Sequence, residues 1–336
     1  IVNGLTSVTI PDSVTTIGDY AFFDNDLTSV TFLGNFEAFE LNMFRGSSNL
    51  TAITYVQGKT GWPKTFTPAG SGSVAATNTF EQAGFAYVIT SANTVTVSGR
   101  ASGNTDTVIE IPDTVASNGI TYSVTTIGEN AFFDNSLTSV AIPDSVTSIG
   151  KDAFFNNNLA SLTIGNNVTT IGNGAFRNNQ LTSLTIPNSV TSIGEDAFFN
   201  NNLASLTIGN GVTTIGDYAF AENDLISLTL PDSVTTIGAG AFLSNKLTSV
   251  TLGDSVTTIG SNAFRDNNLT EVTFMGNFGT FDLNMFTGNS DLTTITYDED
   301  KSGWPVTFTP AGTGSVAVVP EPLPGLPIWL LYQATQ

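Results

Sequence analysis

The chain has 336 residues, of which 29 are acidic and 9 basic, so its formal net charge is −20. This balance disfavours nucleic acid and anionic lipid as partners, because both attract clustered Lys and Arg. Neither Cys nor His occurs in the sequence, which excludes disulfides, thiolate or imidazole metal sites and His-based catalytic triads. The 24 Phe residues and a hydrophobic fraction of 40% favour a folded core over disorder.

The first 76 residues are interpreted as the C-terminal part of one module, closed by an end cap. Residues 31–55 recur with few changes at 273–297. Trp62 and Trp304 occupy equivalent places in the two copies, and they lie 242 residues apart, eleven times a 22-residue period. The sequence therefore predicts a partial module followed by a complete one. The predicted parts are 1–76, 77–318 (hairpin cap 77–123, repeats 124–291, end cap 292–318) and a Pro-rich tail at 319–336.

Residues 77–123 are predicted to form the N-terminal cap of the complete module. The segment GFAYVITSANTVTVSG at 84–99 has two runs of alternating apolar and polar side chains around a polar turn, a pattern typical of a β-hairpin. The extended segment TDTVIEIPDTV at 105–115 then leads toward the first repeat. A distinct terminal unit is expected because a solenoid must cover its open end.

Residues 124–291 repeat with a period of 22, and four residue types keep the same step in register. The leucines are Leu137, Leu159, Leu181, Leu203, Leu225, Leu247 and Leu269. The isoleucines are Ile127, Ile149, Ile171, Ile193, Ile215, Ile237 and Ile259. The phenylalanines are Phe132, Phe154, Phe176, Phe198, Phe220, Phe242 and Phe264. The asparagines are Asn135, Asn157, Asn179, Asn201, Asn223, Asn245 and Asn267. One turn cannot bury its apolar side alone, but stacked turns produce a continuous core.

Within one turn we expect a short strand from which Leu159, Leu162 and Ile164 enter the core. A second extended segment, VTTI, also directs its first and last side chains inward. Gly172 is expected to permit a bend without Cβ strain.

The remainder of the turn is expected to cover the edge of the core and reverse the chain. Ala175-Phe176 fits a short helical or 3₁₀ piece. Asn178-Asn179 fits the reversal, because Asn tolerates the left-handed region and bonds to its own backbone.

The consensus L-x-x-[LV]-x-[IL]-[PG]-x-x-V-T-x-I-G-x-x-A-F-x-x-N resembles the leucine-rich repeats of the BspA-type bacterial surface proteins. The pattern covers 124–292 and reappears at 5–53. The resemblance implies a leucine-rich repeat solenoid of short β-strands and turns, with a β-hairpin N-terminal cap and irregular end caps. It also implies an extracellular or cell-surface location and attachment to host or matrix proteins or to other cells. Members of the family often carry Cys where this chain has the asparagine column.

The tail at 319–336 is rich in Pro and contains a short apolar run, LPIWLL. It resembles the start of a Pro-Glu-Pro-type C-terminal sorting signal, which implies membrane anchoring. The apolar run is shorter than the ~20 residues that cross a bilayer, and the terminal basic cluster of such a signal is missing. The alternative is an ordinary Pro-rich tail. Because Ile1 falls inside a repeat, we expect the chain to belong to a longer tandem protein.

A column of Thr residues lies on the strand segment, where alternation directs it outward. This candidate hydroxyl face consists of Thr163, Thr185, Thr207, Thr229 and Thr251. Such a face suits contact with carbohydrate or ice. The alternative is that these residues only provide β-propensity and solubility.

A second candidate surface follows the core phenylalanine, because the next residue varies between otherwise similar turns. Aromatic and Arg side chains there are the usual anchors of protein interfaces. The candidate partner surface consists of Phe133, Phe155, Arg177, Phe199 and Arg265, together with Trp62 and Trp304 from the end caps. The alternative for these residues is packing alone.

No catalytic or cofactor-binding residue is predicted. Acidic pairs such as Glu195-Asp196 lie on turns and have no partner across a cleft, which a glycosidase requires. Structural calcium is the one cofactor that the turns suit, because Asp24-Asn25-Asp26 and Asp298-Glu299-Asp300 offer oxygen ligands.

The sequence thus predicts a non-enzymatic binding or adhesion scaffold at the bacterial surface, with a host, matrix or cell-surface protein or glycan as its partner. One alternative function is a structural stalk or surface-layer spacer. Another is an ice- or glycan-binding face built on the Thr and Ser columns.

Overall fold

The computed structural model describes residues 4–35, 38–39, 43–56, 59, 65–66, 74–117, 119–277, 279–282, 284–297, 302, 307–308 and 316–320. Their regular elements are strands joined by turns, and the described residues include no helix. Within these ranges no helix is therefore long and apolar enough to span a bilayer. Two compact units are present, residues 1–105 with 112–131 and residues 106–111 with 132–336. The module boundaries expected from the duplication stay a prediction.

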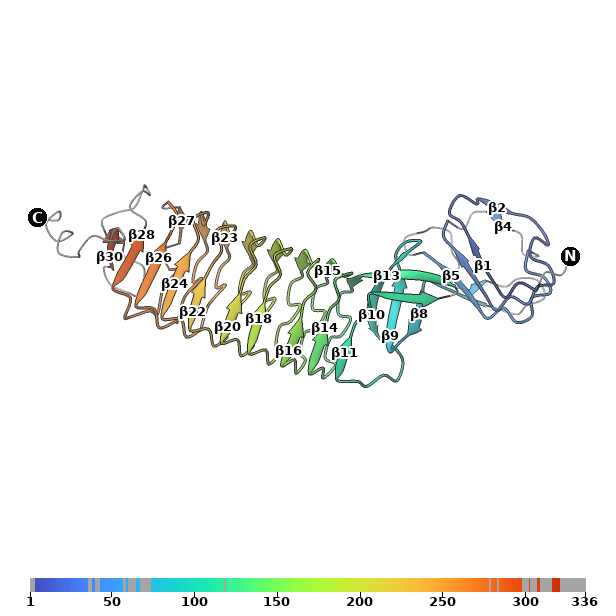
Figure 1. Ribbon diagram of the computed structural model, residues 1–336, viewed down its shortest axis with the longest axis horizontal. Helices are drawn as coiled ribbons and strands as arrows, with labels where there is room; N and C mark the ends of the chain where they lie inside the picture. Colours follow the sequence, from blue (N-terminus) through green and yellow to red (C-terminus); the bar gives the residue numbers. More distant parts are fainter. Residues whose placement is uncertain are drawn as a thin grey trace, which may run out of the picture. The chain divides into compact units, whose positions relative to one another are not determined.

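The second unit is a β-solenoid whose central turns, from β14 to β27, each contribute one strand to each of two rows. Figure 1 shows the strands following one another along this unit. The first strand row consists of β11 (Val108–Glu110), β14 (Ser139–Ala141), β16 (Ser161–Thr163), β18 (Ser183–Thr185), β20 (Ser205–Thr207), β22 (Ser227–Thr229), β24 (Ser249–Leu252), β26 (Glu271–Phe274), β28 (Thr294–Tyr297) and β30 (Val316–Pro320). The second strand row consists of β15 (Ser148–Ile149), β17 (Thr170–Ile171), β19 (Ser192–Ile193), β21 (Thr214–Ile215), β23 (Thr236–Ile237), β25 (Thr258–Ile259) and β27 (Thr280–Phe281).

The first unit contains solenoid turns followed by the predicted hairpin. Its solenoid sheet consists of β1 (Ser7–Ile10), β3 (Ser29–Phe32), β5 (Ala52–Tyr55), β7 (Val74–Thr77) and β6 (Thr65–Phe66), and a smaller pair consists of β2 (Thr16–Ile17) and β4 (Ala38–Phe39). The cap sheet consists of β8 (Thr79–Gln82), β9 (Phe85–Ile89), β10 (Thr94–Arg100), β13 (Ile120–Ile127) and β12 (Thr114–Ser117). Antiparallel pairing of β9 with β10 confirms the hairpin.

The ends of the two solenoids have the same strand arrangement, in agreement with the duplication. In the first unit, β7 pairs parallel with β5 and antiparallel with β6. In the second unit, β30 pairs in the same way with β28 and with β29 (Thr307–Phe308).

The core follows the predicted 22-residue columns. Leu159, Val168 and Ile171 are at most 2% exposed, and Ile164 is 8% exposed. The column phenylalanines are fully buried, and their rings stack turn upon turn, with centroids 5.1 to 5.6 Å apart from Phe132 to Phe286. Because these contacts join neighbouring turns, burial is gained only when the turns stack.

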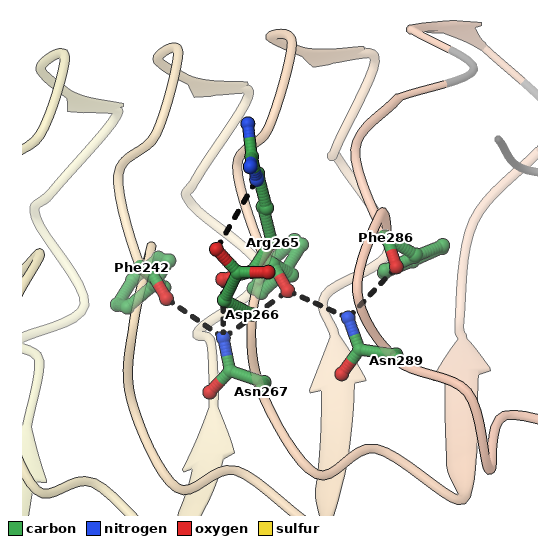
Figure 2. A network of polar contacts seen from close by, with 7 residues as sticks. Phe242, Arg265, Asp266, Asn267, Phe286 and Asn289 are labelled. Carbon is green, nitrogen blue, oxygen red and sulfur yellow. Dashed lines mark hydrogen bonds and ion pairs between the residues drawn. The ribbon is translucent and has the colours of Figure 1, made fainter. Parts of the chain in front are cut away.

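The asparagine column links the turns through the backbone. Oδ1 of Asn201 accepts a hydrogen bond from the Leu181 N–H of the preceding turn (3.2 Å). Its Nδ2 donates to the carbonyls of Phe176 (3.0 Å) and Phe198 (3.2 Å). Figure 2 shows the Nδ2 atoms of Asn267 and Asn289 donating to backbone carbonyls in the same way. Each buried amide therefore satisfies backbone groups of two successive turns, which are costly to leave unpaired.

The helical piece expected at Ala175-Phe176 is wrong. The chain forms turns there, with left-handed residues before and after the core phenylalanine, Gly174 (φ +62°) and Asn178 (φ 56°). Two left-handed residues so close together interrupt a right-handed helix. The reversal at Asn178 agrees with the expectation for that residue.

The column glycine has a different role from the one expected. Gly172 is not among the residues with positive φ. A Cβ at this position would lie 2.7 Å from the carbonyl carbon of Gly150 and from the Lys151 nitrogen. Glycine is therefore required because successive turns approach one another closely at this point, and not because of a special φ.

The cap hairpin buries Tyr87 completely, and its hydroxyl has no hydrogen-bond partner among the described residues. Burial raises the pKa of Tyr87 from 10.0 to about 12. The Tyr87 hydroxyl therefore loses its proton at lower pH in the unfolded chain than in the folded one. Its contribution to the free energy of unfolding is complete below pH 10 and is lost as the pH rises toward 12.

Replacing Tyr87 with Phe should remove this alkaline loss, which amounts to about 3 kcal/mol. It should also raise stability near neutral pH by about 1 kcal/mol. Urea unfolding at pH values from neutral to alkaline measures both effects. Tyr218→Phe is the control, because Tyr218 is exposed, and it should leave the urea midpoint at neutral pH unchanged. An unchanged alkaline slope in Tyr87→Phe would contradict the prediction.

The first strand row of the second unit is divided into three groups of hydrogen-bonded strands. The groups are β11-β14-β16, the pair β18-β20, and the strands from β22 to β30. No pairing joins β16 to β18 or β20 to β22 among the described strands. The second strand row, by contrast, is continuous from β15 to β27. Strand pairing is thus interrupted at two places in the first strand row, while the second strand row is continuous.

The residue directly after the buried Ile or Leu that closes each first-row segment accounts for this grouping. Pro and Gly alternate at this position, as Pro143, Gly165, Pro187, Gly209, Pro231 and Gly253. A Cβ on Gly209 would lie 2.5 Å from the Pro187 carbonyl, so only Gly permits this approach to the preceding turn. The Asn210 N–H also donates to Asn188 Oδ1 at 2.9 Å. A turn that has Gly at this position therefore lies close to the preceding turn, which has Pro there. Where the following turn again has Pro, as at Pro187 and Pro231, the two first-row strands do not pair.

Candidate functional site

The candidate hydroxyl face lies where it was expected. Thr163, Thr185, Thr207 and Thr229 are exposed on the first strand row, and Thr251 is half-buried. Pairing places Thr185 opposite Thr207 in register. Exposed serines form a parallel line, two residues before each Thr, at Ser161, Ser183, Ser205, Ser227 and Ser249. The face thus consists of two lines of hydroxyl groups that run across the strands.

A groove of about 450 Å³ crosses this face at the break between β16 and β18. It is lined by Leu162, Thr163, Ile164, Asn166, Ser183, Leu184, Thr185, Pro187, Ser205 and Thr207. No charged side chain is among them. The groove therefore combines hydroxyl and amide groups with an apolar floor.

The floor is apolar because the break uncovers a core residue. Leu162 and its equivalent at the second break, Leu206, are half-buried. On the strands that follow the two breaks, Leu184 and Leu228 are nearly covered, at 5% and 3% exposed, as is Val250 at 2% on β24, which is paired on both sides. Each break therefore uncovers the core residue of the strand before it. The 22-residue columns predict the same burial for each of these residues, so this difference was not predicted from the sequence.

A signal for the paired turns is present in the sequence. The segment DAFFNNNLASLTIGN occurs at 152–166 and again, unchanged, at 196–210. The repeat is therefore 44 residues long as well as 22, and the longer period coincides with the distance between the two breaks.

The structure assembles four members of the candidate partner surface into one continuous ladder. The rings of Phe133 and Phe155 stack at 5.1 Å. The guanidinium of Arg177 lies between Phe155 and Phe199, 5.7 Å and 4.8 Å from the ring centroids. These four residues, Phe133, Phe155, Arg177 and Phe199, are called the aromatic–arginine ladder below.

The remaining predicted members lie apart from this ladder. In the next turn the equivalent residue is Ala221, which is fully buried. Arg265 follows two turns later, where its Nε pairs with Asp266 at 3.2 Å. Trp62 and Trp304 lie outside the described residues.

The one charged member of the ladder, Arg177, is paired with an acidic residue. Arg177 Nη1 pairs with Asp196 Oδ2 at 2.7 Å. Burial raises the pKa of Asp196, while Arg177 lowers it and Asp152 raises it. These groups line a polar depression of about 330 Å³ beside the ladder. The ion pair orients Arg177 so that both faces of its guanidinium contact aromatic rings, an arrangement that favours stacking.

The turn Asp24-Asn25-Asp26 does not present its amide as a calcium ligand. Asn25 is 7% exposed, its Oδ1 accepts from the Leu5 N–H, and its Nδ2 donates to Phe22. Across the described part of the chain, no group of three or more Asp and Glu is arranged to hold a metal ion. The second predicted turn, 298–300, falls outside the described residues.

The fold and the repeat define a leucine-rich repeat solenoid. The family model for the BspA-type leucine-rich repeat region matches the chain in six copies, at residues 2–66, 113–226 and 213–302. The chain therefore belongs to the BspA-type leucine-rich repeat family. No curated protein sequence matches it.

Several solved structures of bacterial leucine-rich repeat proteins are similar to the chain. A leucine-rich cell surface protein of Faecalibacterium prausnitzii is 21% identical, with 72% of this chain and 94% of that one covered and a TM-score of 0.41. The pneumococcal vaccine antigen PcpA is 19% identical, with 65% and 81% covered and a TM-score of 0.45. A leucine-rich repeat protein of Bacteroides capillosus is 31% identical, with 39% and 98% covered and a TM-score of 0.34. Because these scores are low, the family assignment rests on the family model and on the repeat.

Proposed function

We propose that the chain is a non-enzymatic binding or adhesion scaffold of the bacterial cell surface, with a protein or glycan partner. The observation that carries the proposal is the extended, in-register surface of the second unit, where equivalent side chains recur from turn to turn. Such a surface suits a large partner better than a small substrate, because a solenoid contacts its ligand through many repeats at once.

The aromatic–arginine ladder supports a protein partner. Aromatic and Arg side chains dominate the binding energy of protein interfaces. Phe133 is 44% exposed, although it is a large apolar residue. The Arg177–Asp196 pair and the two flanking rings hold the ladder in one conformation, so a partner would not have to order it on binding.

The binding test uses the whole chain, labelled and applied to arrays of extracellular-matrix proteins, glycans and intact cells. We expect binding to at least one class. For a protein partner, Phe155→Ala should weaken binding by about tenfold or more, as is usual for an anchor residue. Lys246→Ala is the matched control, because Lys246 is exposed and lies away from the ladder. Absence of binding to every class would contradict the proposed function.

Ice binding is less well supported than partner binding. An ice-binding face needs a flat lattice of hydroxyl groups, and the two breaks interrupt the first strand row. We therefore expect no thermal hysteresis from the chain. Its appearance, and its loss in Thr185→Tyr with Thr207→Tyr, would show that the Thr column functions as an ice face.

A further inference from the structure

The groove at the β16–β18 break differs from the rest of the hydroxyl face in having both depth and an uncovered core residue. Gly165 draws its turn toward the preceding one, and Pro187 begins the next pair. The resulting opening exposes part of Leu162 between the two strands. Since the second strand row stays paired behind it, the opening is a permanent feature of the fold and not a separation of the turns.

The lining of the groove selects for an uncharged ligand. Its exposed polar groups are the amide of Asn166 and the hydroxyls of Thr163, Ser183, Thr185, Ser205 and Thr207. The chain carries a net charge of −20, yet none of this charge lies in the lining. An ionic ligand would find no counter-charge here. A protein partner would find none of the aromatic or Arg anchors that interfaces favour.

We propose that this groove binds an extended, uncharged glycan chain, which lies across the strands of the first row. The inference rests on the proposed binding function and names its ligand class. A sugar ring has an apolar C–H face and a rim of hydroxyl groups. Leu162 contacts the C–H face of the sugar ring, while the Ser and Thr hydroxyls exchange hydrogen bonds with its hydroxyl groups. Binding sites for small molecules combine apolar and polar lining in this way.

The second break defines the length of the ligand. It lies between β20 and β22, where Leu206 is uncovered in the same way. The two openings are one turn pair apart, which corresponds to about 10 Å at the ~4.8 Å spacing of neighbouring strands. An extended β-1,4-linked glycan repeats every two sugars over a comparable length. One chain of six sugars can therefore place equivalent rings at both openings.

The test measures the affinity of the whole chain for cellohexaose and for chitohexaose by calorimetry. At least one should bind, and about tenfold more tightly than its disaccharide, because only the longer chain reaches both openings. Maltohexaose, whose α-1,4 linkages coil the chain, should not bind. Added NaCl should leave the affinity unchanged, because neither ligand nor groove carries charge.

The groove is tested directly by Thr185→Tyr. Thr185 is exposed on a strand, and Tyr favours strands, so the variant should fold while its ring fills the groove. Affinity for the hexasaccharide should fall by about tenfold or more. Ser249→Tyr is the matched control on β24, which is paired on both sides, and its affinity should stay that of the parent chain.

Two results would overturn the inference. One is that neither hexasaccharide binds, and the other is that both Tyr variants bind as the parent chain does. If the chain meanwhile binds a matrix protein on the array, the glycan inference fails while the proposed scaffold function stands. If the chain binds no ligand on the array or in calorimetry, both the glycan inference and the proposed scaffold function fail.

Discussion

Replacing Asn201 with Ala should lower the free energy of unfolding by about 2 kcal/mol. Asn201 is 5% exposed and bonds to the Leu181 N–H and to the carbonyls of Phe176 and Phe198. Truncation leaves the Leu181 N–H without its partner, at about 1–3 kcal/mol when water cannot reach it. The Phe176 and Phe198 carbonyls each lose one of two hydrogen bonds, because Asn179 and Asn223 still donate to them. Urea unfolding followed by circular dichroism measures the loss.

The matched control is Asn202→Ala in the same turn. Asn202 is exposed, and its change should cost less than about 0.5 kcal/mol, as surface substitutions usually do. Asn201→Asp separates the two roles of the amide, because a carboxylate accepts from Leu181 but cannot donate to a carbonyl. Stability close to that of the parent chain in Asn201→Ala would show that the asparagine column does not hold the turns together.

Replacing Gly216 with Ala should destabilise the solenoid by about 3 kcal/mol, the upper range for overpacking. A Cβ at Gly216 would lie 2.6 Å from the carbonyl carbon of Gly194 and 2.7 Å from the Glu195 nitrogen. Both are backbone atoms of the preceding turn, so no side chain can move aside. The turns must separate, which strains the hydrogen bond from Gly216 to the Ile193 carbonyl (2.9 Å).

Gly18→Ala provides the matched control for this prediction. Gly18 occupies the equivalent place in an I-G pair of the first unit, but a Cβ there meets nothing within 4 Å and φ is not positive. Ala should be neutral or stabilising by about 0.4–1 kcal/mol, because it restricts the unfolded chain. Equal urea midpoints for the two variants would contradict a stacking role for the column glycine.

The inward residues could be predicted because a 22-residue period places the same column in the same environment in every turn. Leu159, Val168 and Ile171 needed only this spacing and their apolar character. The hairpin at 84–99 followed from alternation alone. The helical piece at Ala175-Phe176 was a wrong prediction, because local propensity does not reveal left-handed residues at Gly174 and Asn178.

The candidate surfaces were predicted only as columns. Arg177 was placed on a partner surface because its position varies, but nothing in the sequence indicated that Asp196 would hold it between two rings. The contacts join residues 19 or 22 positions apart, and side-chain orientation decides them. The groove was missed because its lining belongs to three separate turns.

The sequence by itself determined the architecture of this protein. Its period, its apolar columns and its lack of Cys and His define a repeat solenoid without thiol or imidazole chemistry. Only the tertiary structure decided how the turns meet, since that depends on backbone atoms of different turns coming within contact distance. The bonding of the asparagine column, the need for Gly172 and Gly216, and the opening of the sheet before Pro187 all arise from that stacking.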